Sequence, residues 1–388
     1  MVSYDVAFVP SDEKSHREVL ARIHAAWCSG ERPPAQPRPV IEQSWLRMKR
    51  SGVNPAKEPA EIADRPSGED APILAVLPLV KGMLEPLLDD DVLLVLADER
   101  GTVQWRGGGR KMMQSADRLA FQPGRRWSEQ AVGTNAIGTA LSAGIPVHVH
   151  AAEHFCISHH GWSCAAAPVV DPRSGRPLGV IDLSFPVGEA NPMAVALVAS
   201  IARQIGVELK ETHRRELRRM AASARTPAAG QWALVDHWGW VAASGGIAAA
   251  DRIRLPGMPL DGFSVDGLGL VRAEPLHGGW LLRPAASSGT SVQLELTLSA
   301  HRCWFTIRGS GAETIHELQG RRASVVSWLA DHSGGVSGRE LAEAIYGRPD
   351  ALAAVRAEIS RINRELGTVV HSRPYRLAES IQVIDRRM

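Results

Sequence analysis

Residues 124–185 read GRRWSEQAVGTNAIGTALSAGIPVHVHAAEHFCISHHGWSCAAAPVVDPRSGRPLGVIDLSF, and this stretch decides the fold of the N-terminal half. A short helix is predicted over residues 134–141, and the alternating apolar residues at 145–149 predict a strand. Residues 165–170 and 178–185 are apolar runs that predict two buried strands joined by a turn. These elements, in this order, predict one half of a small domain of the α/β (α+β) class.

The motifs WSE, GTNAIGTAL, EHF, WSC and GVIDLS follow one another within residues 124–185. Their order resembles the GAF sensor domain of acetoin-catabolism-type, sigma-54-dependent bacterial activators. Upstream, residues 40–52 resemble the helix that opens this family, and residues 91–105 resemble the first hairpin of its sensor. The hairpin begins with an apolar run that is suited to a central strand buried on both faces. The resemblance covers roughly residues 15–220, about half of the chain.

The resemblance implies that a small molecule binds over the sheet in a mostly apolar pocket with a few polar groups. From their positions in the matching motifs, the candidate effector-binding residues are Trp127, Thr134, Asn135, Ile137, His154, Phe155, Trp162 and Cys164. Each also has a structural explanation. Thr134 is placed to cap a helix, Asn135 to hold a loop, and the aromatic residues to fill a core.

The loop at 150–164 is dense in potential metal ligands, namely His150, His154, Cys156, His159, His160 and Cys164. A zinc or haem site needs thiolate or neutral imidazole groups that converge at short distances. The spacing C-x-x-H-H-x-x-x-C is not a zinc-finger pattern, and a strand-loop-strand path would scatter these side chains. We therefore predict no metal site and no cofactor, and keep a haem- or metal-based redox or gas sensor as an alternative.

The composition bounds the class of protein. A chain of 388 residues is long enough for two or three domains, and a net charge of +2 indicates no particular partner. The four cysteines are too few and too scattered for a disulfide framework. No apolar run approaches the roughly 20 residues needed to cross a bilayer, and the start MVSYDVAFVPSDEK lacks the pattern of a signal peptide. These observations predict a cytoplasmic protein without a membrane partner.

The chain divides by pattern into five regions. We predict an N-terminal helical region at 1–70, a GAF sensor domain at 71–209, a helical linker and hinge at 210–230, a β-rich module at 231–300 and a winged-helix domain at 301–388. A long helical pattern begins after Asn191, and a helix that leaves a sensor in this way usually pairs with its twin, which predicts a homodimer.

The β-rich module resembles no family that we recognise. Its short pieces read QWALVD, GWVAAS, DRIRLPG, GLGLVRA, GGWLLRP and SVQLELTLS, and their length and spacing predict strands. At this point two placements are open, since the module could extend the sheet of the final domain or cap the sensor.

The C-terminal region has the order of a winged helix-turn-helix. Strand-like runs at 303–309 and 313–319 precede a helix at 321–332. Ser337 and Glu340 then have the spacing of a capping box, so a second helix is predicted to begin just after Ser337. A third helix is predicted near Asp350, followed by the hairpin-like VVHSRPYRL. The motifs RELAEAIYG, IxRxNRELG and a final YRL resemble the DNA-binding domain of OmpR/PhoB-type response regulators. Ser372–Pro374 replaces the glycine that usually precedes the tyrosine of the wing.

In the third helix, Leu352, Val355, Ile359, Ile362 and Leu366 recur at spacings of three and four and therefore share one face. The opposite face and its flanks suit the major groove of DNA. The candidate DNA-binding residues are Arg356, Ser360, Arg361, Asn363 and Arg364 on the helix, with Arg373 and Arg376 on the hairpin as phosphate contacts. Glu358 and Glu365 leave an alternative, an ordinary solvated helix paired by salt bridges.

Three common catalytic motifs are absent from the sequence. Gly107–Gly109 is followed by Arg110 and Lys111 but by no Ser or Thr, so the phosphate cradle of a Walker A loop is missing. Neither a G-x-S-x-G elbow nor an H-E-x-x-H helix occurs. Activators with the sensor that this chain resembles usually continue into an ATPase. Because the Walker A loop of such an ATPase is missing from this sequence, we predict a non-enzyme that acts without ATP hydrolysis.

The leading hypothesis is a one-component transcription regulator. A small-molecule effector would shift the population able to grip double-stranded promoter DNA, and the protein would act by occupying DNA or by recruiting RNA polymerase. The second alternative, beside the metal or haem sensor, is an interaction protein that binds another regulator through its sensor and does not touch DNA.

Overall fold

The computed structural model describes residues 13–56, 62, 71–84, 88, 91–256, 263–285, 293–298, 303–309, 312–366, 369–378 and 381–385. The chain forms two compact units, Met1–Thr212 and His213–Met388. We describe each unit by itself.

The first unit is built on an antiparallel five-stranded sheet of order β2-β1-β5-β4-β3. Its strands are β1 (Leu93–Asp98), β2 (Val103–Gly108), β3 (Val147–His150), β4 (Trp162–Val170) and β5 (Pro177–Pro186). β1 lies between β2 and β5, and Leu93 to Ala97 are all buried. The prediction of a central strand buried on both faces is therefore confirmed.

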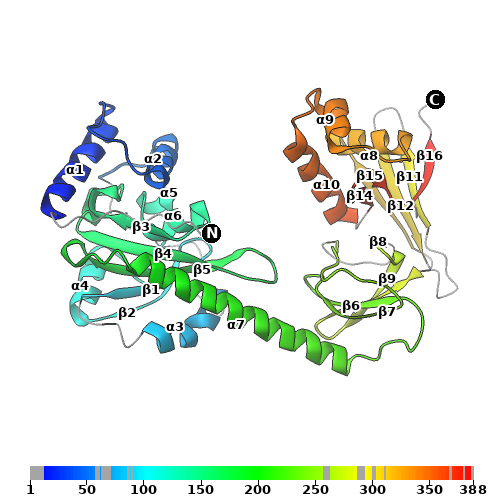
Figure 1. The fold of residues 1–388 in the computed structure, drawn as a ribbon, viewed down its shortest axis with the longest axis horizontal. Helices are drawn as coiled ribbons and strands as arrows, with labels where there is room; N and C mark the ends of the chain where they lie inside the picture. Colours follow the sequence, from blue (N-terminus) through cyan, green and yellow to red (C-terminus); the bar gives the residue numbers. More distant parts are fainter. Residues whose placement is uncertain are drawn as a thin grey trace. The chain divides into compact units, whose positions relative to one another are not determined.

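Helices cover both faces of this sheet (Figure 1). One face carries α1 (Glu13–Ser29), α2 (Pro39–Ser51), α4 (Arg110–Arg118), α5 (Glu129–Val132) and α6 (Ala136–Ala143). The other face carries η1 (Pro72–Val76), α3 (Leu77–Leu84) and the first part of α7 (Ala194–Ser223). Alternate residues of β1 enter the two cores: Leu93 and Val95 face the first, and Leu94 and Leu96 face the second. This is the period-two pattern of a strand between two layers.

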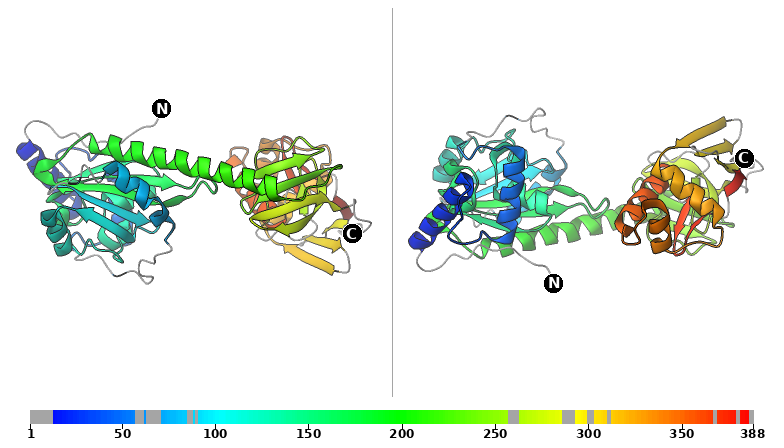
Figure 2. Two further views of the ribbon diagram at one scale, coloured as in Figure 1. Left: turned by 90° about the horizontal axis from the view of Figure 1, so that it is seen from below. Right: turned by 90° about the horizontal axis from the view of Figure 1, so that it is seen from above.

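The N-terminal helices belong to the same core as the sheet. Ile41, Trp45 and Met48 of α2 are buried and pack with β1 and α6 in one cluster. Burial of each such side chain is worth roughly 1.5–3 kcal/mol. The right-hand view of Figure 2 shows α1 and α2 lying across one face of the sheet. The structure thus joins the predicted N-terminal region and sensor in one compact unit.

The long helix predicted after Asn191 is α7, which begins at Ala194 and ends at Ser223. Its buried apolar residues, which include Val195, Val198, Ile201 and Ile205, pack on the sheet of the first unit. The division between the two units falls within α7. The second unit includes the end of this helix, where His213 is buried and its Nε2 lies 2.7 Å from Oδ2 of Asp236.

The second unit contains a first antiparallel sheet of order β7-β6-β10-β9-β8. Its strands are β6 (Trp232–Asp236), β7 (Val241–Gly245), β8 (Phe263–Val265), β9 (Gly269–Leu276) and β10 (Gly279–Pro284). We call this sheet and its loops the β6–β10 module. The strand predicted at residues 251–257 is wrong for its described part, because residues 251–256 form only an isolated bridge between Trp240 and Arg252. Residue 257 lies outside the described residues.

The second sheet has the order β13-β12-β11-β16. It is formed by β11 (Gln293–Leu298), β12 (Cys303–Gly309), β13 (Ala312–Leu318) and β16 (Ile381–Asp385), and β16 runs parallel to β11. The sequence pattern assigns the piece SVQLELTLS to the β-rich module, but its strand β11 pairs with β12 and β16. Of the two placements considered for the β-rich module, this piece follows the first, because it extends the sheet of the final domain. The sequence pattern does not predict the strand β16.

Three helices and a hairpin complete the second unit. They are α8 (Arg321–Asp331), α9 (Gly338–Tyr346), α10 (Leu352–Leu366) and the pair β14 (Val370–Ser372) and β15 (Tyr375–Leu377). The capping box predicted at Ser337 and Glu340 is confirmed, and α9 begins directly after Ser337. The apolar stripe predicted on α10 is confirmed as well, since Val355, Ile359 and Ile362 are buried against α8, α9 and the second sheet. Within the described ranges, no helix is both long and apolar enough to cross a membrane.

Candidate functional site

A small cavity lies in the first unit between the sheet and the start of α6. Six of the eight predicted effector-binding residues line it: Trp127, Asn135, Ile137, His154, Trp162 and Cys164. The remaining lining residues are Leu119, Phe121, Ala136, His159, Asp182 and Ser184. The free volume is about 10 Å³, roughly the room that one water molecule needs. The cavity is therefore a small site with a mixed polar and apolar lining.

The GTNAIG motif shapes one wall of the cavity. Asn135 caps α6, because its Oδ1 accepts a hydrogen bond from the Gly138 nitrogen at 2.9 Å and its Nδ2 donates to the Gly133 oxygen at 2.8 Å. Gly133 has a φ of 74°, and a Cβ there would lie 2.8 Å from the Cβ of Phe155. Glycine is needed at this position, so the motif fixes the backbone that carries Asn135 and Ile137.

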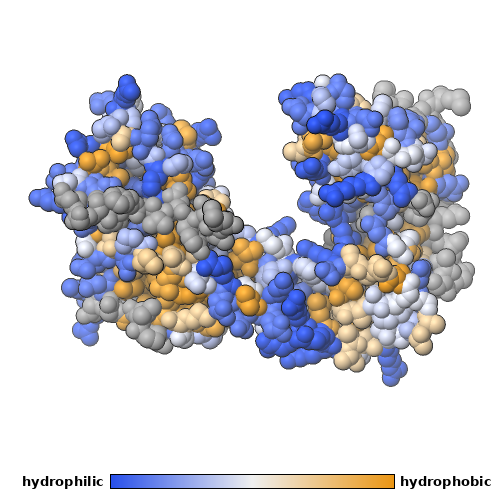
Figure 3. Space-filling view, viewed as in Figure 1, coloured by the Kyte–Doolittle hydropathy of each residue, from blue (hydrophilic) through white to orange (hydrophobic). Residues whose placement is uncertain are grey.

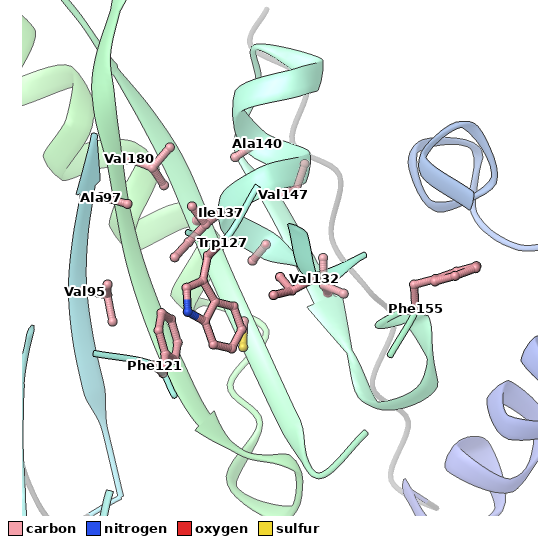
Figure 4. Packing of buried hydrophobic residues seen from close by; sticks show 14 of the residues in the cluster. Val95, Ala97, Phe121, Trp127, Val132, Ile137, Ala140, Val147, Phe155 and Val180 are labelled. Carbon is pink, nitrogen blue, oxygen red and sulfur yellow. The ribbon is translucent and has the colours of Figure 1, made fainter. Parts of the chain in front are cut away.

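Stacked aromatic rings form a second wall. The rings of Phe121 and Trp127 are stacked with centroids 3.9 Å apart, and Trp127 also stacks on His159 at 5.0 Å. In the close view of Figure 4, Trp127 and Phe121 lie side by side between the strands and α6. Such offset stacking holds the indole in one orientation.

A buried polar cluster from β4 and β5 forms the floor. The Ser184 hydroxyl donates a hydrogen bond to Oδ2 of Asp182 at 2.6 Å, and the Cys164 sulfur lies 3.1 Å from the same hydroxyl oxygen. Asp182 is 1% exposed, and burial raises the pKa of its carboxyl to about 7, against the opposing effect of the Ser184 hydrogen bond. Near neutral pH this carboxyl is therefore able to donate or to accept a hydrogen bond.

Three polar atoms of the cavity residues have no hydrogen-bond partner in the described part of the chain. They are Nε1 of Trp127, Nδ1 of His159 and Oδ1 of Asp182. A buried polar atom without a partner costs about 1–3 kcal/mol, and in native proteins such atoms point to a role or to a missing ligand. The cavity thus offers an indole donor, an imidazole nitrogen and a carboxyl group to a bound molecule.

The two histidines that line the cavity, His154 and His159, are neutral at physiological pH. Burial lowers the pKa of His154 well below its usual value, and burial together with His160 lowers the pKa of His159 to about 4. His154 Nδ1 lies 3.0 Å from the Ala151 oxygen and donates to it. Neutral imidazoles and a cavity of this size favour an uncharged ligand over an ionic one.

The structure does not bring Thr134 and Phe155 to the cavity, in contrast to the sequence prediction for these two residues. The Thr134 side chain is buried and contacts the Ser44 hydroxyl at 2.7 Å, within a network that also holds Glu129 and Arg47. Phe155 packs edge-on against His24 of α1 at 5.9 Å. Figure 4 shows its side chain pointing away from Trp127.

The potential metal ligands of the 150–164 loop are spread out. Throughout the described ranges, no group of three or more His, Cys, Asp or Glu side chains is placed to hold a metal ion. Cys156 lies near the Asn54 backbone oxygen rather than in the cavity. Burial and the nearby Asp182 raise the pKa of the Cys164 thiol well above its usual value, so this thiol is protonated. A protonated thiol is a poor ligand and a poor nucleophile.

Sequence reasoning missed Asp182 and His159 in this cavity. The signal for Asp182 was present, because a single acidic residue interrupts the apolar run of GVIDLSF, and a buried carboxylate without a charged partner is rare outside functional sites. His159 carried no such signal, since six His and Cys residues crowd the same loop.

A second candidate surface lies on α10 in the second unit. Arg356, Arg361 and Arg364 are exposed and Ser360 is half-buried. Figure 3 shows mostly hydrophilic residues on the visible face over α9 and α10. Arg361 is paired with Glu358 at 2.8 Å, which is the kind of salt bridge expected of an ordinary solvated helix. An exposed i,i+3 pair contributes only about 0.2–0.5 kcal/mol. The pair with Glu358 is therefore weak enough for Arg361 to exchange it for a contact with a DNA phosphate.

Asn363 is placed differently from its predicted role. It is 5% exposed, and its side-chain amide forms two hydrogen bonds with the backbone of Val370. We therefore leave Asn363 out of the proposed DNA contacts. On the hairpin, Arg373 is exposed and Arg376 is half-buried.

Residues 20–207 match the model of the MimR N-terminal domain family. A Rhodococcus erythropolis protein, described as an uncharacterized 47.3 kDa protein in the thcA 5' region, is 33% identical over 181 residues, which are 45% of this chain and 41% of the relative. The acetoin dehydrogenase operon transcriptional activator AcoR of Bacillus subtilis is 33% identical over 175 residues, 43% of this chain and 29% of AcoR. The propane 2-monooxygenase operon transcriptional activator MimR of Mycolicibacterium smegmatis is 30% identical over 205 residues, 53% of this chain and 34% of MimR.

The chain thus spans less than half the length of each of these relatives. The similarity lies in the N-terminal half, where it supports the assignment of this region as the sensor half of such regulators. The two relatives with a stated role are transcriptional activators rather than enzymes.

Proposed function

We propose that this protein is a ligand-responsive transcription regulator, with a GAF-type sensor in its first unit and a winged helix-turn-helix in its second. The observation that carries the sensor half is the small cavity with three unpartnered polar atoms, among the described residues, on Trp127, His159 and Asp182. The similarity of residues 20–207 to operon activators supports the same conclusion.

The effector is a small uncharged molecule that carries hydrogen-bonding groups. A free volume of about 10 Å³ requires the walls to move apart even for a few heavy atoms. Binding therefore changes the position of α6 or of the loop that carries His154 and His159. The relatives named for acetoin dehydrogenase and propane 2-monooxygenase operons support effectors of small size.

The DNA-binding half rests on α10 and the hairpin. α9 and α10 form two consecutive helices with a short connection, and the exposed Arg361 and Arg364 lie opposite the buried stripe. This order is that of a helix-turn-helix whose second helix enters the major groove. We propose Arg361, Arg364 and Ser360 as base or phosphate contacts and Arg373 and Arg376 as phosphate contacts. The sequence contains no Walker A loop, so the proposed action involves no ATP hydrolysis.

A homodimer through α7 completes the proposal. α7 exposes Leu197 and Val207 among its polar residues, with 37% and 60% of their surface accessible. Two copies of such a helix cover these side chains when they pair. A dimer would present two DNA-binding units to a pair of half-sites.

The proposal is tested by binding of purified protein to fragments of its source genome. We expect steep salt dependence, and loss of binding when Arg361→Ala and Arg364→Ala are combined. Arg283→Ala serves as the matched control, because Arg283 is a partly exposed arginine of the same unit that pairs with Glu274 at 3.4 Å. Equal binding by the double variant and the wild type would overturn the DNA-binding assignment.

For the sensor, thermal shifts with a panel of small alcohols, ketones and amides should be lost in Asp182→Ala.

A further inference from the structure

A large groove in the second unit joins the β6–β10 module to the proposed DNA-binding elements. Its volume is about 950 Å³. One wall is a flank of α10 with Arg356 and Ser360, and a second is the hairpin at 370–375. The third wall comes from the module, through residues 248–254 and 265–267. The module, α10 and the hairpin therefore share one open groove.

The groove has an excess of positive charge. Arg252, Arg254, Arg356 and Arg373 line it, and Asp266 is the one acidic residue among the lining residues that the structure describes. Asp266 is already paired with His371 at 3.1 Å. Over the described ranges, Arg254, Arg356 and Arg373 are exposed and form no salt bridge. Arginines that line one groove repel one another, and an anion between them lowers that cost.

Arg252 is held in place for such a contact. Its guanidinium lies over the Trp240 ring, 5.4 Å from the ring centroid, and its Nε donates to the Trp238 oxygen at 2.8 Å. An arginine fixed in this way loses little side-chain entropy when it binds a phosphate. The bridge between Trp240 and Arg252 also fixes the backbone of this segment.

We propose that the β6–β10 module is the second wall of the DNA-binding groove and that Arg252 and Arg254 contact backbone phosphates of the bound duplex. This inference rests on the proposed function, because it places DNA on α10. Phosphate contacts lie beside a recognition helix and fix its register on the duplex. The DNA strand that passes between α10 and the hairpin would therefore run along the groove. There Arg356 and Arg373 lie on the walls formed by α10 and the hairpin, and Arg252 and Arg254 lie on the wall formed by the module.

The arrangement differs from one in which the module covers the recognition helix. The groove involves the flank with Arg356 and Ser360, whereas Arg361 and Arg364 do not line it. The outward face of α10 is thus separate from the face turned to the module. DNA on the outward face brings its phosphates to the flank, which is where the module supplies charge.

The test compares variants of the full-length protein by fluorescence anisotropy on a DNA fragment that the wild type binds, over a range of salt concentrations. We expect Arg254→Ala to weaken binding by the same factor on specific and unspecific duplexes. The slope of log K against log salt should become shallower by about 0.9, the value for one lost phosphate contact. Arg252→Ala combined with Arg254→Ala should lower the slope by about twice as much. Arg283→Ala, on the same module but outside the groove, should leave affinity and slope unchanged.

The outcomes separate this inference from the proposed function. Normal affinity and slope in the Arg252 and Arg254 variants, together with loss of binding in the Arg361 and Arg364 double variant, would overturn only the role of the module. Tighter binding by Arg254→Glu would also overturn it, because that result is expected if the module blocks DNA. A wild-type protein that binds no duplex fails the proposed function itself. Thermal unfolding of each variant shows that the fold is kept.

Discussion

The side-chain amide of Asn363 joins the end of α10 to the first strand of the hairpin. Its Nδ2 donates to the Val370 oxygen at 2.7 Å, and its Oδ1 accepts from the Val370 nitrogen at 2.9 Å. Both residues are buried. This pair of bonds reproduces the pattern that one strand forms with another, so Asn363 fixes how the hairpin sits against the helix.

We expect Asn363→Ala to destabilise the second unit by about 1–3 kcal/mol, because it leaves two buried backbone groups of Val370 without partners. Chemical unfolding followed by circular dichroism measures this loss. Ser360→Ala is the matched control on the same helix, since Ser360 is half-buried and its loss should cost little. An Asn363→Ala protein of unchanged stability with an altered DNA sequence preference would contradict the structural role and favour base reading.

The contrast between Asn363 and its neighbours shows where sequence reasoning stops. The periodicity of Val355, Ile359 and Ile362 predicted the buried face of α10, because that face depends on spacing alone. The same helical geometry placed Asn363 on a flank that looked open. The flank is covered by β14, a segment that returns from further along the chain. Coverage by a segment outside the helix leaves no signal in the periodicity of the helix itself.

In the cavity of the first unit, too, local sequence motifs predicted some of the site residues, whereas contacts with other segments decided the rest. The GTNAIG motif predicted that Asn135 and Ile137 lie at the site, because a cap and two glycines fix the local backbone. Phe155 was placed at the site by its motif, yet it faces α1, which lies more than a hundred residues away in sequence. Asp182 was overlooked because it stands within a strand that otherwise reads as core.

Asp182 should make the stability of the first unit depend on pH. Its carboxyl has a pKa of about 7 in the folded protein against an ordinary 3.8. Between these values the folded state binds the proton more tightly than the unfolded state, so the wild type loses stability as pH rises from about 4 to 7. The amide side chain introduced by the substitution Asp182→Asn does not titrate, so this variant lacks that loss.

We therefore expect the melting temperature of Asp182→Asn, relative to the wild type, to rise between pH 4 and 7 and to level off above pH 7. Differential scanning fluorimetry across this range measures the difference. Asp117→Asn is the control, because its carboxyl is close to the surface and its pKa is lowered by hydrogen bonds from Gln122 and Arg106. A constant difference between D182N and the wild type would contradict the raised pKa.

The cysteines should differ sharply in reactivity. Cys28 is exposed, whereas Cys156, Cys164 and Cys303 are buried. Burial raises the pKa of Cys164 well above its usual value, which keeps it as a thiol at neutral pH. We expect a thiol reagent to modify one cysteine quickly in the native protein and all four after unfolding. Cys28→Ser should abolish the fast phase, and fast modification of Cys164 would instead support the redox-sensor alternative.

The capping box before α9 offers a test of the local stability of the second unit. The Ser337 side chain accepts from the Glu340 nitrogen at 3.2 Å, and the Glu340 carboxylate accepts from the Ser337 nitrogen at 2.7 Å. Ser337→Ala should destabilise the unit by about 1 kcal/mol, the usual value for loss of an N-cap. Ser337→Asp, which keeps the capping oxygen, should restore the stability in the same unfolding assay. Equal stability of the alanine and aspartate variants would show that the cap contributes nothing.

The hydrogen bond from Ser184 to Asp182 gives a more direct test of the cavity floor. This bond lowers the pKa of Asp182 and so opposes the effect of burial. Ser184→Ala removes the donor, so the midpoint of the Asp182 titration should move upward from about 7. Carbon NMR of the protein labelled at aspartate measures this midpoint. Since the protonated carboxyl is then favoured over a wider range, effector binding that uses Asp182 as a donor should persist to higher pH. Ser174→Ala, in the turn between β4 and β5, is the control outside the cavity. A midpoint that moves down in Ser184→Ala would mean that the Ser184 hydroxyl does not donate to Asp182. The hydrogen bond assigned to the floor of the cavity would then be wrong.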